Sequence, residues 1–130
     1  MNILCTICGR KGSKEIPNKN LSLFLKKPLV WYTIKQAKEC NIFTKIVISS
    51  DSDKILKIGK NFKLDLMIKR PNNLCTDNMS KLKVIKHAFQ YSENFFKIKF
   101  DHIIDLDITA PLRTVLDIKK VYKKIKNKKK

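Results

Sequence analysis

Short apolar runs alternate along this chain with longer segments in which apolar residues recur every three or four positions. The short runs are rich in β-branched residues at their centres, which is typical of strands buried in a parallel sheet. The expected strands are Ile3–Ile7, Thr44–Ser49, Leu64–Ile68 and Phe100–Ile108. A short extended piece is also expected at Leu21–Phe24.

The segments between these runs have helical periodicity. Pro28 suits the first turn of a helix that reaches about residue 40. Ser49, Ser50 and Asp51 offer N-cap chemistry for a second helix, which Gly59–Lys63 is expected to close. A third helix is expected from about Ser80, and its apolar face comprises Leu82, Ile85, Ala88, Phe89, Ser92 and Phe96. The last helix is expected over Val115–Ile125.

Strands that alternate with helices predict an α/β fold, a three-layer sandwich with a mostly parallel sheet covered on both faces. Right-handed crossovers place the loops that follow the strands on one rim of the sheet. The loops that begin at Cys8, Ser49, Lys69 and Ile108 would therefore share that rim. An open sheet of this kind binds its ligand there.

The length and charge set further bounds. The 130 residues predict one domain over 1–125 with a basic tail at 126–130. The net charge is +18, but the cations are 26 Lys and only 3 Arg, alongside 17 Ile and 10 Asn. This pattern favours a coding bias over a specific nucleic-acid surface, because readers of phosphates and bases rely on Arg forks. A basic domain that binds polyanions or acts as a scaffold remains the alternative.

The four cysteines do not form a metal or disulfide framework. Cys5 and Cys8 make one C-x-x-C, but Cys5 falls in an expected buried strand and no second ligand pair exists. Free thiols fit a reducing compartment. The N-terminus lacks the features of a signal peptide and no apolar run is long enough to span a membrane, so a cytoplasmic location without membrane contact is expected.

A basic loop follows the first strand and holds two of the three glycines, Gly9 and Gly12. Backbone N–H groups together with Arg10, Lys14 and Lys19 make a concavity suited to phosphate oxygens. The loop matches neither a G-x-G-x-x-G motif nor a P-loop. An ordinary connection in a lysine-rich protein would look similar from these residues alone.

The motif R-x-G-S-K-x-x-P-x-K-N in this loop resembles the opening motif of the acylneuraminate cytidylyltransferases, which make CMP-activated sialic acids and related nonulosonic sugars. Further segments resemble the family in the same order and at about the same spacing: KPLVWYTIKQA (27–37), IVISSDSDKI (46–55), RPNNLCTDN (70–78) and DLDITAPLRT (105–114). The resemblance implies a Rossmann-like fold of the nucleotide-diphospho-sugar transferase type. It covers the N-terminal portion of the family only, so a fold truncated at its C-terminus is expected.

The resemblance implies roles for residues of the basic loop and the later motifs. Arg10 and Lys19 match the two catalytic cations that act on the triphosphate. The nucleotide-binding positions would be Gly12, Ser13, Asn20, Arg70 and Ser80. The pocket for the sugar would include Asp107, Thr109 and Arg113. Lys11 stands where the family usually has Gly. Its side chain would either point to solvent or change the backbone of the loop.

Asp105 and Asp107 alternate near a strand end, so both side chains should lie on one face of the sheet. Burying two neighbouring carboxylates costs free energy unless they bind a cation. Mg²⁺ held between these carboxylates and phosphate oxygens would offset that cost. Asp107 stands where many family members carry Gln, so its role is left open between a contact to the metal and a contact to the sugar. Asp105 has an equally acceptable structural role as a partner of Arg113.

The sequence therefore predicts a nucleotidyltransferase that transfers CMP from CTP to a sialic-acid-like nonulosonic acid and releases pyrophosphate. Its expected cofactor is Mg²⁺, and its expected partners are CTP and the sugar acid, with no specific nucleic acid. Most of the acceptor pocket of the family would lie beyond this chain, so its activity is expected to be impaired. A homodimer or a complementing chain is left open, as is a cytidylyltransferase for another acidic sugar such as 3-deoxy-octulosonate.

Overall fold

The computed structural model describes residues 1–9, 23–24, 27–71, 81–106, 108 and 115–128. The strands are β1 (Ile3–Gly9), β2 (Leu23–Phe24), β3 (Lys27–Pro28), β4 (Lys45–Ser50), β5 (Leu66–Lys69) and β6 (His102–Asp105). The helices are α1 (Leu29–Cys40), α2 (Asp53–Asn61), α3 (Lys81–Phe96) and α4 (Val115–Lys128). The predicted alternation of strands and helices is confirmed. The last helix reaches into the segment expected as a basic tail.

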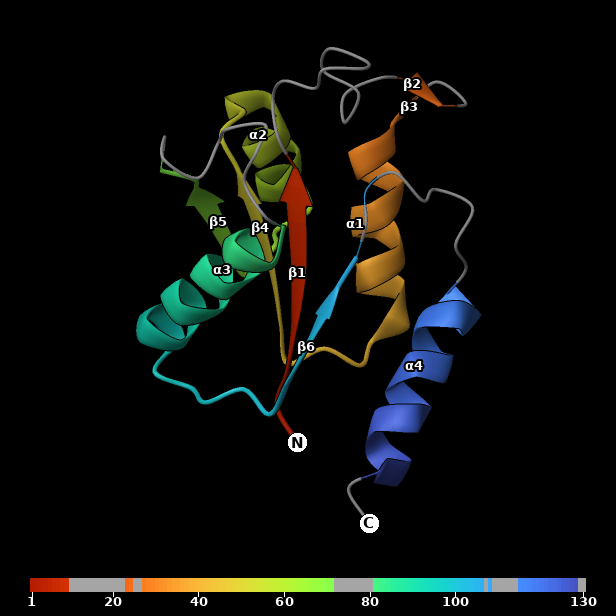
Figure 1. Ribbon diagram of the computed structural model, residues 1–130. Helices are drawn as coiled ribbons and strands as arrows, with labels where there is room; N and C mark the ends of the chain where they lie inside the picture. The colour runs from red at the N-terminus through yellow and green to blue at the C-terminus, as the bar shows by residue number, and fades with distance from the viewer. Residues whose placement is uncertain (10–22, 25–26, 72–80, 107, 109–114, 129–130) are drawn as a thin grey trace.

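The main sheet has four parallel strands in the order β5–β4–β1–β6, and β2 and β3 form a separate antiparallel pair. The chain first builds outward from β1 through β4 to β5, and then returns to the other side of β1 to add β6. The arrowheads of the parallel strands point to one edge of the sheet, while both termini lie at the opposite end (Figure 1). The predicted α/β sandwich with a shared rim is therefore confirmed.

Helices cover both faces of this sheet (Figure 1). On one face, α1 and α2 pack on the strands and α4 packs on α1, around a core that includes Ile7, Ile34 and Ile48. On the other face, α3 packs on β1 and β4 over a smaller core that includes Leu4, Val47 and Ala88. Both faces of β1 are thus apolar, which explains its nearly continuous hydrophobic run.

The start of α2 differs from the predicted one, while its end agrees with the prediction. Its N-cap is Ser52, one residue beyond the three polar residues that were expected to supply it, and the Ser52 hydroxyl accepts from the Ile55 N–H at 3.4 Å. The helix ends at Asn61 with Phe62 as its C-cap, within the segment Gly59–Lys63 that was expected to close it, and Gly59 itself is still helical. A Cβ at Gly59 would lie 2.9 Å from Cγ2 of Ile48, so the glycine allows α2 to pack closely on β4.

The buried face of α3 also differs in part from the predicted one. The buried residues are Val84, Ala88 and Ser92, whereas Leu82 is 75% exposed. Leu82 lies in the first turn, near the rim, where no part of the sheet packs over it. Among the described residues, no helix is long and apolar enough to cross a membrane.

Candidate functional site

The strand order has a topological switch point between the paired strands β1 and β6, and the position outside the carboxyl ends of these two strands is called the crevice here. The chain passes from β1 to β4 through α1 on one face of the sheet, and from β5 to β6 through α3 on the opposite face. Open α/β sheets bind ligands at such a switch point, outside the carboxyl ends of the strands. Gly9 ends β1 and Asp105 ends β6, so both lie beside this crevice.

Thr6, Asp105 and Lys81 form a connected group on the α3 side of the crevice. Thr6 and Asp105 are paired in register across β1 and β6, and the Thr6 hydroxyl donates to Oδ1 of Asp105 at 2.7 Å. Nζ of Lys81, the first residue of α3, lies 3.0 Å from Oδ2 of the same carboxylate. Thr6 is completely buried, while the Lys81 side chain is 49% exposed. One carboxylate therefore connects β1, β6 and the beginning of α3.

Cys8 lies two residues beyond Thr6 on the same face of β1. Burial, together with the nearby Asp105 carboxylate, raises the pKa of the Cys8 thiol to about 12, although Arg70 and Lys81 act in the opposite direction. The thiol also hydrogen-bonds to Asp105. Cys8 is therefore a neutral thiol at physiological pH and a poor nucleophile. Cys5, Cys8 and Cys40 are all free, as expected.

Arg70 follows β5 directly and is only 5% exposed. Its backbone N–H donates to the Ser50 carbonyl at 2.9 Å. Its Nη2 donates to the carbonyl oxygens of Gly9 and Ser49, both at 3.2 Å. The sequence offered a contact to the nucleotide or a solvated loop cation as the two roles for Arg70. The described geometry adds a third, a buried cation among main-chain carbonyls.

The other predicted site residues fall outside the described part of the chain. These are Arg10, Gly12, Ser13, Lys19, Asn20, Ser80, Asp107, Thr109 and Arg113. Their roles stay predictions. The segments that contain them nevertheless follow β1, β5 and β6, at the rim where those strands end.

Sequence reasoning missed Thr6, Cys8 and Lys81 as neighbours of Asp105. Thr6 and Asp105 are 99 positions apart, and no local pattern marks Thr6 as different from any β-branched strand residue. A polar residue at the centre of an otherwise apolar run was the one available signal. Asp105 had been expected to bind a metal or to pair with Arg113, and the described partners are Thr6 and Lys81.

The described carboxylate does not by itself fit a divalent cation. One Asp105 oxygen accepts from Thr6, and the other is paired with the Lys81 ammonium, whose charge would repel Mg²⁺. Within the described ranges, no group of three or more His, Cys, Asp or Glu side chains could hold a metal. Asp107, the second predicted ligand, lies outside those ranges.

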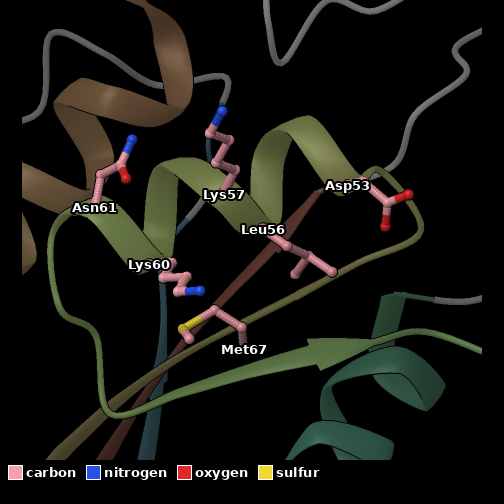
Figure 2. Close-up of a pocket in the computed structure, with 6 residues that line it drawn as sticks. All are labelled: Asp53, Leu56, Lys57, Lys60, Asn61 and Met67. Carbon is pink, nitrogen blue, oxygen red and sulfur yellow. The ribbon is translucent and has the colours of Figure 1, made fainter.

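A hollow of about 430 Å³ lies away from the crevice, between α2 and the edge strand β5 (Figure 2). Its lining residues are Asp53, Leu56, Lys57, Lys60, Asn61 and Met67. Two strands of the sheet, β4 and β1, separate β5 from β6. Of the predicted site residues that the structure describes, Arg70 and Asp105, neither lines this hollow.

Comparison with known proteins gives a consistent result. The sequence profile of the cytidylyltransferase family matches residues 4–130. A CMP-N,N'-diacetyllegionaminic acid synthase of Campylobacter jejuni is 45% identical over 109 residues, which cover 84% of this chain and 46% of that protein. A pseudaminic acid cytidylyltransferase of the same species is 37% identical over 124 residues, covering 95% of this chain and 53% of that protein.

A solved structure shares the fold. It is a CMP:2-keto-3-deoxy-manno-octonic acid synthetase complexed with CTP, which superposes with a TM-score of 0.73 at 17% identity and covers 98% of this chain and 48% of its own. The chain spans about half the length of the curated relatives it matches. The resemblance found in the sequence motifs is confirmed at the level of the family. The chain belongs to the cytidylyltransferase family.

Proposed function

We propose that this chain is the nucleotide-binding half of an enzyme that transfers CMP from CTP to a nonulosonic acid. The observation that carries the proposal is the topological switch point between β1 and β6, where Gly9 ends β1 ahead of the basic loop and Asp105 ends β6. The relatives that match across this region are named as a CMP-N,N'-diacetyllegionaminic acid synthase and a pseudaminic acid cytidylyltransferase.

In the proposed reaction, a hydroxyl oxygen of the sugar acid attacks the α-phosphorus of CTP. The new P–O bond forms as the bond to the β-phosphate oxygen breaks, pyrophosphate leaves, and the hydroxyl proton passes to a base or to water. Such a transition state concentrates charge on the phosphoryl oxygens, so positioned cations are the main catalytic requirement. Arg10 and Lys19 are the proposed cations, and Gly12, Ser13 and Asn20 the proposed nucleotide contacts.

The chemistry of the described residues supports a site that holds an anion without using a protein nucleophile. The Cys8 thiol is neutral, and the Asp105 carboxylate is engaged by Thr6 and Lys81. Mg²⁺ bound between phosphate oxygens and Asp107 would supply further charge neutralisation, and it belongs to the proposal. A cytoplasmic location and a partner that supplies the acceptor half, either a second copy or another chain, also belong to it.

The test is calorimetric titration of the chain with CTP and, separately, with ATP in Mg²⁺ at physiological ionic strength, about 0.15 M. Preferential binding of CTP is the expected result, because a base-specific pocket distinguishes cytosine from adenine while phosphate contacts do not. Equal and weak binding of both nucleotides that fades with added salt would contradict the proposal. It would indicate a basic domain with general affinity for polyanions.

A further inference from the structure

The buried guanidinium of Arg70 spans the ends of neighbouring strands. Arg70 follows β5, and its backbone N–H is bonded to Ser50 at the end of β4. From there the side chain reaches across β4 to the carbonyl of Gly9, the last residue of β1. Neighbouring strands lie about 4.8 Å apart, so a long side chain is needed for this span.

The two accepting carbonyls lie at the carboxyl ends of two neighbouring strands, next to the rim. Ser49 and Gly9 belong to β4 and β1, which are paired side by side, and a single Arg70 nitrogen donates to both at 3.2 Å. Carbonyl oxygens carry partial negative charge, and buried ones are costly when they are not hydrogen-bonded. A guanidinium that donates to them fixes the strand ends and places a positive charge directly below the rim.

We infer that Arg70 is a positioning residue for the nucleotide site, acting through the main chain of Gly9 and Ser49. Gly9 is the residue from which the chain continues into the predicted phosphate-binding loop. Fixing its carbonyl sets the direction in which that loop begins. The inference rests on the proposed function for the identity of the ligand, and it assigns Arg70 a role different from the expected direct contact to the nucleotide.

The two roles predict different effects on nucleotide selectivity. A residue that positions the phosphate-binding loop affects CTP, UTP and ATP alike, because all three carry the same triphosphate. A residue that contacts the cytosine affects CTP far more than ATP. The affinity for each nucleotide therefore separates a positioning role from direct recognition.

The experiment compares Arg70→Lys and Arg70→Gln with the wild-type chain, titrating CTP, UTP and ATP under conditions where circular dichroism shows each variant folded. Arg70→Gln is expected to weaken all three by the same factor, about tenfold or more, because a buried charge-assisted interaction is lost. Arg70→Lys keeps the charge but not the fork, so an intermediate loss is expected. Lys69→Gln is the matched control: it removes one cation from the adjacent position, where Lys69 is 56% exposed and paired with Asp53 at 2.8 Å. It is expected to change the affinities less than twofold.

A loss confined to CTP, or no loss with Arg70→Gln, would overturn the inference. A wild-type chain with no nucleotide affinity would instead refute the proposed function. In that case, hydrogen exchange without ligand tests whether Arg70 fixes the strand ends through its hydrogen bonds to Gly9 and Ser49. Arg70→Gln is expected to accelerate exchange of amides near Gly9 and Ser50, while amides at the other end of β1, near Ile3, stay as protected as in the wild type. Exchange that accelerates uniformly along β1, or not at all, would show that Arg70 does not fix these strand ends.

Discussion

Replacing Thr6 by Val tests whether the Asp105 carboxylate stabilises the fold at the crevice. The two side chains have the same shape, so the change removes the hydroxyl donor with little effect on packing. Thr6 is completely buried and donates to Asp105 at 2.7 Å. A hydrogen bond to a charged group contributes about 1.5–3 kcal/mol. The Asp105 side chain is 16% exposed and keeps Lys81 as a partner, so water and Lys81 recover part of that loss.

We therefore expect Thr6→Val to lower the free energy of unfolding by about 1–2 kcal/mol. With a urea m-value of about 1.5 kcal/mol/M, the unfolding midpoint falls by roughly 1 M. The assay is urea unfolding followed by circular dichroism. Thr44→Val is the matched control, because the Thr44 hydroxyl accepts from the Ile3 N–H at 2.9 Å at an exposed position. A loss of about 0.5 kcal/mol is expected there.

The reasoning is refuted if Thr6→Val unfolds at the same urea concentration as the wild type, or shifts no more than Thr44→Val. Asp105→Asn provides an independent check. In a double-mutant cycle with Thr6→Val, the two changes should be coupled, because each removes one side of the same hydrogen bond. Purely additive effects would show that the Thr6 hydroxyl and the Asp105 carboxylate do not depend on each other.

Three further predictions concern the site and its support. Arg10→Ala should weaken CTP binding by about 1.5–3 kcal/mol if its guanidinium contacts the triphosphate, and an unchanged calorimetric affinity would remove Arg10 from the site. The Cys8 thiol, with its pKa raised from 9.0 to about 12, should resist iodoacetamide in the folded protein at pH 8.5, as measured by site-resolved mass spectrometry. Labelling at the rate of the unfolded protein would contradict this protection. Because the unfolded thiol ionises above pH 9 while the folded one keeps its proton, Cys8 also makes the free energy of unfolding fall as the pH rises from 9 to 12. Gly59→Ala should destabilise the fold by about 1 kcal/mol in urea unfolding, since overpacking against Ile48 at 2.9 Å outweighs the helix propensity of Ala; a stabilised variant would show that Ile48 moves freely.

The order of elements could be predicted from the sequence because each strand and helix has its own local pattern. The β-branched run that became β4 and the stripe that became α1 needed no knowledge of their neighbours. The errors occurred where a neighbour decides the outcome. The polar residues Ser49 to Asp51 suggested the start of α2, yet the N-cap is Ser52, and the close approach of Gly59 to Ile48 was not visible in the local pattern. Leu82 matches a helical stripe, yet the structure buries Val84 in that turn and leaves Leu82 exposed.

The candidate site divides in the same way. Its location followed from the topology, because the carboxyl ends of parallel strands meet at one rim. The identity of the family followed from separated motifs. The partners of Asp105 and Arg70 could not be predicted, since Thr6 and Gly9 lie in a strand far from them in the sequence. Such pairs depend on strand order and register, and neither is encoded locally.

The strand order also has a kinetic consequence. The residues paired in register are 19 positions apart in β4–β5 and 41 apart in β1–β4, whereas those in β1–β6 are 99 apart. The entropy of closing a loop grows with its length, and distant pairings slow folding. We expect β5, β4 and β1 to assemble first as the chain emerges from the ribosome. The pairing of β1 with β6 would then be the last part of the described sheet to form, and the proposed nucleotide site would stay incomplete until β6 had been synthesised.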